Sequence, residues 1–201
     1  LSLPAGVGMS VLAGPILQLL YPAVPETAAA ATYHLQILGG ASVLVCLMLL
    51  CNGVLQAYGR VYIPIATACV GGAVKVASNY VLCGDPAFGI RGAPISTLLC
   101  YGVIALLDLA AVAWVLGRNR PGYFRLFAKP AAAAAVMALA ARGSFGALVD
   151  GGLSPGLAVV PAILLAAAVY GVLAILLRMV TREELALFPK GEKIAEWLHI
   201  R

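Results

Sequence analysis

The stretch PGLAVVPAILLAAAVYGVLAILLRM at residues 155–179 decides the class of this protein. It carries no charged residue before Arg178. A helix of roughly 20 apolar residues is long enough to cross the hydrocarbon core of a bilayer. Similar stretches recur along the chain, separated by turns rich in Pro and Gly, so we predict an all-α polytopic membrane helix bundle of about six transmembrane helices. The predicted segments are 3–21, 33–56, 61–83, 92–117, 126–142 and 155–179.

The composition supports the same class. Of 201 residues, 63% are hydrophobic and 10% are charged, whereas a soluble domain usually carries about 25% charged residues. The net charge of +5 is spread between the apolar stretches and does not form one basic patch. A nucleic-acid partner is therefore not expected, and the lipid bilayer is the predicted surrounding.

No grouping of side chains indicates catalysis or metal binding. The five cysteines lie in or beside apolar stretches and lack the paired spacing of a zinc site. His34 and His199 are far apart, and no carboxylate pair or Ser, His and Asp set appears. We expect no enzyme activity, no metal and no cofactor, with the cysteines packed as small apolar side chains.

The basic residues predict the orientation, because cytoplasmic loops collect Lys and Arg. With alternating segments, ten basic residues fall on one side, and Arg91 and Arg142 on the other. The C-terminus is therefore predicted to be cytoplasmic and the 22–32 loop external. Beyond the last span, Thr181 and Glu184 fit a capping box, and the apolar spacing up to Leu198 predicts an amphipathic surface helix.

Polar side chains inside the segments are the candidate lining of a substrate path. In segment 61–83 a polar stripe includes Lys75 and Asn79. Lys75 lies roughly 21 Å from the cytoplasmic end of its helix at 1.5 Å per residue. A lysine in the hydrocarbon costs about 3 kcal/mol on insertion scales, so we expect it to face a cavity or a charged partner. The stripe is Pro64, Thr67, Gly71, Lys75, Ser78 and Asn79.

Two further sets of polar residues complete the candidate path. Asn52, Gln56 and Arg60 follow one another at spacing four and are predicted to share one helix face. Interhelical hydrogen bonding is the alternative role for them. Asp108 is predicted to share a face with Thr97 and Tyr101, roughly 13 Å from its cytoplasmic end. It is a possible partner for Lys75 across a height difference of about 8 Å.

Five stretches together resemble stage V sporulation protein B and its relatives. These are polysaccharide-biosynthesis flippases of the multidrug/oligosaccharidyl-lipid/polysaccharide exporter superfamily. The resemblance extends over nearly the whole chain, from the first of these stretches to the last. They are LPAGVGMSVLAGPILQLLYP at 3–22, NGVLQAYGRVYIP at 52–64, GGAVKVASNYVL at 71–82, GIRGAPISTLLCYG at 89–102 and TREELALFPKGEKIAEWL at 181–198.

The resemblance implies a fold of about fourteen helices in two lobes. This chain would be its C-terminal portion: helices nine to twelve at 1–117, two additional C-terminal helices at 118–180 and a cytoplasmic tail at 181–201. Relatives flip lipid-linked cell-wall precursors by alternating access. The implied partners are a lipid-linked saccharide and the N-terminal lobe of the same protein. Where some relatives hold sodium, this chain has Lys75 and Asn79 with Ser96 and Thr97, and the lysine departs from a sodium-ligand pattern.

The resulting hypothesis is a flippase of the bacterial cytoplasmic membrane that moves lipid-linked oligosaccharide or peptidoglycan precursors. A multidrug exporter of the same superfamily is the alternative within transporters. A non-transporting membrane scaffold for cell-wall synthesis and a membrane-embedded glycan polymerase are alternatives from other classes. Short external loops without clustered acids or histidines disfavour the polymerase.

Overall fold

The computed structural model describes residues 2–117 and 123–176. All the regular secondary structure in these ranges is helical. No strand occurs in these ranges, which confirms the all-α prediction. The predicted surface helix at 181–201 lies outside the described residues. The elements are α1 (Ser2–Val11), α2 (Ala13–Leu20), α3 (Pro25–Ala57), α4 (Tyr62–Gly84), the 3-10 helix η1 (Gly89–Arg91), α5 (Gly92–Leu116), α6 (Tyr123–Asp150) and α7 (Pro155–Leu176).

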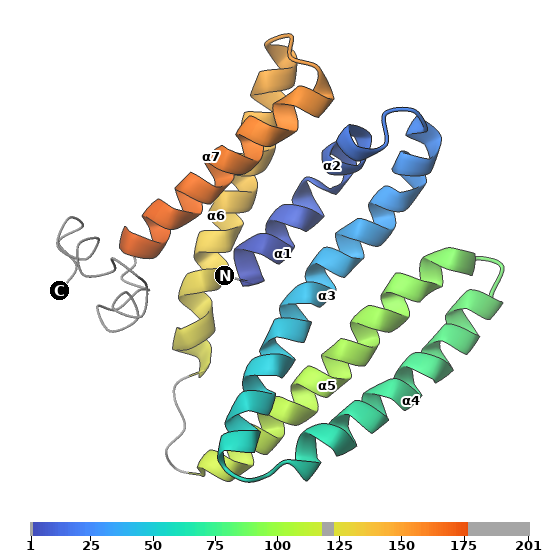
Figure 1. The fold of residues 1–201 in the computed structure, drawn as a ribbon, viewed down its shortest axis with the longest axis vertical. Helices are drawn as coiled ribbons and strands as arrows, with labels where there is room; N and C mark the ends of the chain where they lie inside the picture. Colours follow the sequence, from blue (N-terminus) through green and yellow to red (C-terminus); the bar gives the residue numbers. More distant parts are fainter. Residues whose placement is uncertain (1, 118–122, 177–201) are drawn as a thin grey trace.

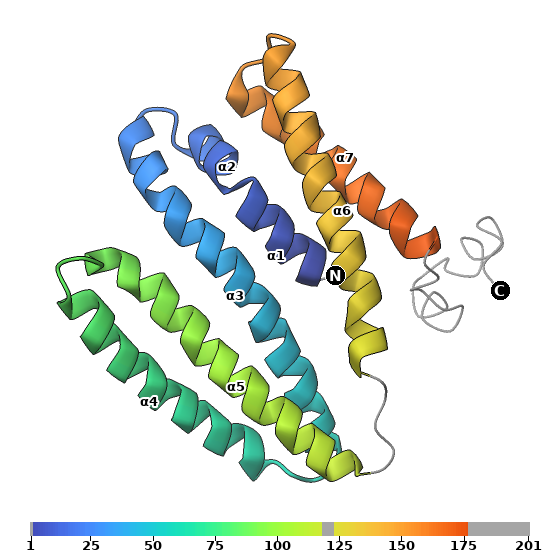
Figure 2. The same cartoon turned by 180° about the vertical axis from the view of Figure 1, so that it is seen from behind.

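The helices stand in a row rather than around a single axis. The α6–α7 pair packs on α1 and α2, these pack on α3, and α3 packs on α5, with α4 at the far end of the row (Figures 1 and 2). Each neighbouring contact is made by a different helix face. The arrangement leaves broad apolar surface along the row, as expected for helices that face lipid.

The lengths and apolar compositions of the helices confirm the prediction of a polytopic membrane helix bundle. Five of the helices in the described residues are long and apolar enough to cross a bilayer, or six segments if the bent pair α1–α2 is one span. Large apolar side chains remain exposed on these helices, among them Tyr80 at 84% and Leu139 at 73%. Such exposure is costly in water and favourable in hydrocarbon. The protein is therefore a multi-pass membrane helix bundle.

The first predicted segment is broken. Helices α1 and α2 meet at Leu12 with a bend of 72°. Pro15 lacks an N–H that could bond to the carbonyl of Val11, and its ring crowds that carbonyl. Val11 is the last residue of α1, so the break falls where this proline removes the hydrogen bond.

Two helix boundaries differ from the predicted segments. Helix α3 begins at Pro25, eight residues before the predicted start, because proline at the first helical position is already set for a helix. Helix α6 continues to Asp150 instead of ending near 142, since its last turns contain no proline. Arg142 therefore lies inside α6 and not in an external loop, and the 22–32 and 144–153 loops are shorter than predicted.

Glycine allows two of the closest helix contacts. Gly6 of α1 faces Gly39 of α3 so closely that a Cβ on Gly39 would lie 2.8 Å from the Gly6 carbonyl oxygen. Gly71 of α4 faces the side chain of Ile104 on α5 in the same way. Small residues let helix backbones approach and gain packing contacts in the membrane.

Candidate functional site

The α4–α5 interface carries most of the polar residues predicted for a substrate path. The two helices run antiparallel, with Thr67 beside Asp108 and Asn79 beside Ser96. On the α4 stripe, Pro64, Thr67 and Gly71 are buried. The stripe residues nearer the C-terminal end of α4 are half-buried. The stripe is therefore the face that packs on α5.

Asp108 is fully buried in this interface, as is Ser96. Its Oδ1 is hydrogen-bonded to the hydroxyl of Thr67 at 2.7 Å. Its Oδ2 is buried and has no hydrogen-bond partner among the described residues. Thr97 and Tyr101, with which Asp108 is predicted to share a face, are half-buried.

Lys75 does not pair with Asp108. Asp108 is level with Thr67, which lies eight residues before Lys75 on α4. That separation is about 12 Å along a helix. Lys75 is half-buried at the level of Cys100, between the Gly71–Ile104 and Asn79–Ser96 contacts. The predicted ion pair is absent because the register of α4 against α5 places Thr67 opposite the carboxyl group.

Asn79 and Ser96 form the second polar contact of the interface. The hydroxyl of Ser96 is hydrogen-bonded to Oδ1 of Asn79 and also lies 2.8 Å from the carbonyl oxygen of Ala93. Ser96 is fully buried and Asn79 half-buried. Hydrogen bonds of this kind hold helices together where no water is available.

The second predicted set does not share one helix face. Helix α3 ends at Ala57, and Gly59 has a left-handed backbone with φ of 72°. Arg60 therefore lies beyond the helix, with its guanidinium 5.4 Å from the ring centroid of Trp114 on α5. Gln56 is exposed, while Oδ1 of Asn52 is buried without a partner in the part of the chain that the structure describes.

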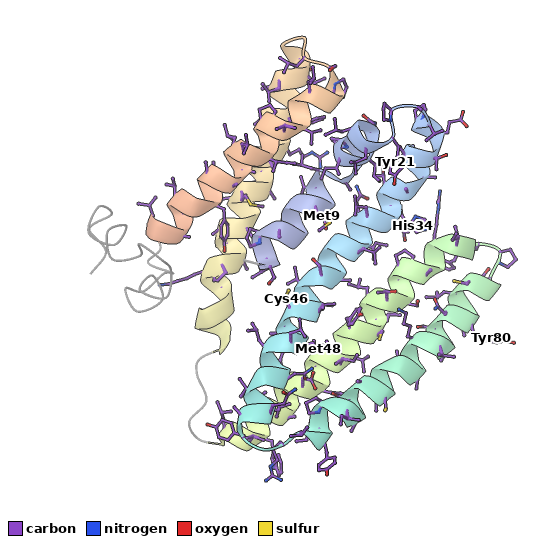
Figure 3. All side chains as sticks on the ribbon, viewed as in Figure 1. Met9, Tyr21, His34, Cys46, Met48 and Tyr80 are labelled. Atoms are coloured by element: carbon purple, nitrogen blue, oxygen red, sulfur yellow. The ribbon has the colours of Figure 1, made fainter. Side chains whose placement is uncertain are left out.

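The opposite end of α3 is tied to the start of α5 by contacts that the sequence analysis missed. The Nε2 atom of His34 lies 3.3 Å from the carbonyl oxygen of Ile90 in η1. The guanidinium of Arg91 lies 5.9 Å from the ring centroid of Tyr33. Figure 3 shows His34 near this end of α3, and Tyr80 projecting away from the bundle on α4. Together with the contact between Arg60 and Trp114, these contacts link the two ends of α3 to the region of α5.

An apolar groove of about 450 Å³ lies elsewhere, between α1, α2, α6 and α7. Leu12, at the break between α1 and α2, is one of its lining residues. Its walls are apolar except for Tyr170, and none of the six predicted path residues lines it. It is lined by Pro4, Ala5, Gly8, Met9, Leu12, Ile16, Met137, Ile163, Ala166, Ala167, Tyr170 and Gly171.

The groove has a weak signature in the sequence. One side of α1 has no large side chains at Pro4, Ala5 and Gly8. On α7, Gly171 likewise has no side chain. Small residues at such spacing indicate either a close helix contact or a groove, and the partner helix decides which. Here α6 and α7 approach from one side and leave the space open.

Helix α4, which carries Lys75, and the helices that form the groove lie on opposite sides of α3 (Figures 1 and 2). The predicted polar residues therefore divide between the α4–α5 interface and the C-terminal end of α3 with the turn after it, and none of them lines the apolar groove. In comparisons with known proteins, no family model matched the chain, and neither a curated protein nor a solved structure matched it.

Proposed function

We propose that this protein is a membrane transporter that flips lipid-linked oligosaccharide or peptidoglycan precursors across the bacterial cytoplasmic membrane by alternating access. The apolar groove between α1, α2, α6 and α7 is the observation that carries this proposal. A lipid-linked saccharide has a long apolar tail that must stay in an apolar surrounding while its polar head crosses the membrane. A groove with apolar walls provides that surrounding.

The sequence resemblance to polysaccharide flippases supports the same function. No catalytic step is assigned to the chain in this proposal, and its partners are the bilayer, the lipid-linked substrate and the other lobe of the transporter. The groove and Lys75 are separated by α3, so one substrate molecule would not contact both in the arrangement described. The proposal therefore rests on the groove and not on the lysine.

Gly171 provides a direct test, because a Cβ at this position meets no atom within 4 Å although the residue lines the groove. Gly171→Phe should therefore fold and fill the groove with its ring. We expect flipping of a fluorescent lipid-linked saccharide by the full-length protein in vesicles to fall about tenfold, which corresponds to about 1.4 kcal/mol of lost binding free energy.

Gly146→Phe on α6 is the matched control. A Cβ at Gly146 also meets no atom within 4 Å, and this residue does not line the groove. Flipping should be unchanged in this variant. If the two variants flipped the lipid equally at equal amounts of folded protein, the groove would no longer support the proposed function. If Gly171→Phe instead abolished export of a hydrophobic drug, the substrate class would be wrong.

A further inference from the structure

The hydrogen bonds between Asp108 and Thr67 depend on whether the Asp108 carboxyl group carries a proton. The Thr67 hydroxyl oxygen lies 2.7 Å from Oδ1 of Asp108 and 3.1 Å from the carbonyl oxygen of Pro64. Both distances fit hydrogen bonds. A threonine hydroxyl has one proton, and two acceptors can share it, as at Ser10 and Ser96. If Asp108 carries a proton of its own, the Thr67 hydroxyl can instead accept from the carboxyl group and donate to the carbonyl oxygen of Pro64.

With a proton on Asp108, the contacts form a continuous chain. The carboxyl group donates from Oδ1 to the Thr67 hydroxyl, and that hydroxyl donates to the carbonyl oxygen of Pro64. With an ionised Asp108, the single Thr67 proton would be shared between Oδ1 and the carbonyl oxygen of Pro64. Oδ2 would then hold part of a buried charge without a donor among the described residues, which is strongly unfavourable.

Among the described residues, no cation is placed to balance an ionised Asp108. On α5 there is no other charged residue, and on α4 the single charge is Lys75, two turns further along. From α3, Cys51 is buried in a cluster with Val112 of α5, and it is a thiol. Arg60, beyond the end of α3, is stacked on the ring of Trp114. The surroundings of Asp108 therefore favour the neutral carboxylic acid.

We propose that Asp108 and Thr67 form a proton-binding site in the α4–α5 interface. While α4 packs on α5, the carboxyl group holds its proton. When the two helices separate and water reaches Asp108, the group dissociates to a carboxylate and the proton passes to water. Proton binding and α4–α5 packing then favour each other, because the proton binds more tightly to the packed arrangement. This inference does not rest on the proposed function.

Infrared spectroscopy of the full chain in lipid tests the proposal. An exposed aspartic acid has a pKa of about 3.9 and is ionised at neutral pH. We expect a carbonyl stretch of a protonated carboxylic acid near neutral pH that shifts in heavy water. The band should be lost in Asp108→Asn and move in frequency in Thr67→Val, because its hydrogen bond is removed. Asp150→Asn, which changes an exposed acid, should leave the band unchanged.

The thermal stability of Asp108→Asn is an independent test of whether Asp108 is protonated. The asparagine amide has nearly the shape of a neutral carboxylic acid and donates to Thr67 as that acid does, so this variant should fold with an unchanged apparent melting temperature. Failure of Asp108→Asn to fold would overturn the proposal, as would the absence of the protonated band from the wild-type protein. Loss of the band on addition of sodium would show a cation site instead.

Discussion

Gly39 is a residue at which the backbones of α1 and α3 come close together. A Cβ added there would meet the hydroxyl of Ser10, and would lie 2.8 Å from the carbonyl oxygen of Gly6 and 3.0 Å from the amide nitrogen of Ser10. The Ser10 hydroxyl is itself hydrogen-bonded to the carbonyl oxygens of Gly6 and Gln36, at 3.0 and 2.8 Å. Because backbone atoms form this wall, no rotamer change can make room.

Gly39→Ala should therefore destabilise the protein, by about 1–3 kcal/mol as for other overpacked sites. The neighbouring Gly40→Ala is the control, because a Cβ at Gly40 meets no atom within 4 Å. It should be neutral or stabilising by up to about 1 kcal/mol, since alanine loses less backbone entropy in a helix. Apparent melting temperatures in detergent measure the difference, and equal values for the two variants would contradict the close α1–α3 contact.

At the scale of the element, the bend between α1 and α2 shapes the groove. Leu12 at the bend lines the groove and belongs to an apolar cluster with Met137, Ala141 and Ala166. Helix α2 turns toward α3 and α7. A straight helix over residues 2–20 would carry its second half out of these contacts. The bend, set locally by one proline, therefore decides where the groove opens.

Pro15→Ala restores an N–H for the Val11 carbonyl and should straighten the segment in part. Spin labels at Ser2 and Gln18 should move apart by up to about 5 Å, given a rise of 1.5 Å per residue. Pro4→Ala is the control, because Pro4 lies in the first turn of α1, where no intrahelical bond is lost. An unchanged label distance in Pro15→Ala would show that packing on α3 and α7 imposes the bend without the proline.

At the scale of the whole molecule, the orientation rests on the distribution of basic residues. Arg142 lies within α6, so Arg91 is the basic residue left in the turns that are predicted to be external. These turns are short, since the helices extend to Leu20, Pro25, Gly84 and Asp150. Ten other basic residues are predicted to lie on the cytoplasmic side, and Lys75 lies within α4.

Single cysteines on a cysteine-free background should report this orientation. Ala87→Cys and Ser154→Cys lie in turns and should react with an impermeant maleimide added to sealed cells. Gly59→Cys, between α3 and α4, should react after the membrane is opened. Ser144→Cys tests the longer α6, and should be shielded because Ser144 is helical and half-buried. External labelling of Gly59→Cys would invert the topology.

Much of the bundle follows from the sequence by itself. Apolar stretches of spanning length and prolines at turns depend on local composition, so the class of protein and most segment bounds were predicted correctly. The break at Leu12, the start of α3 and the end of α6 were not. The polar stripe on α4 and the small residues of α5 at spacing four also follow from helix periodicity.

The tertiary structure alone decided which polar groups meet. The vertical register of α4 against α5 depends on the length of the turn between them and on the fit of Gly71 to Ile104, neither of which periodicity encodes. This register pairs Asp108 with Thr67 and leaves Lys75 two turns away. The groove likewise arises from how α6 and α7 approach a bent α1–α2, because a space between helices is a property of their packing and not of any one segment.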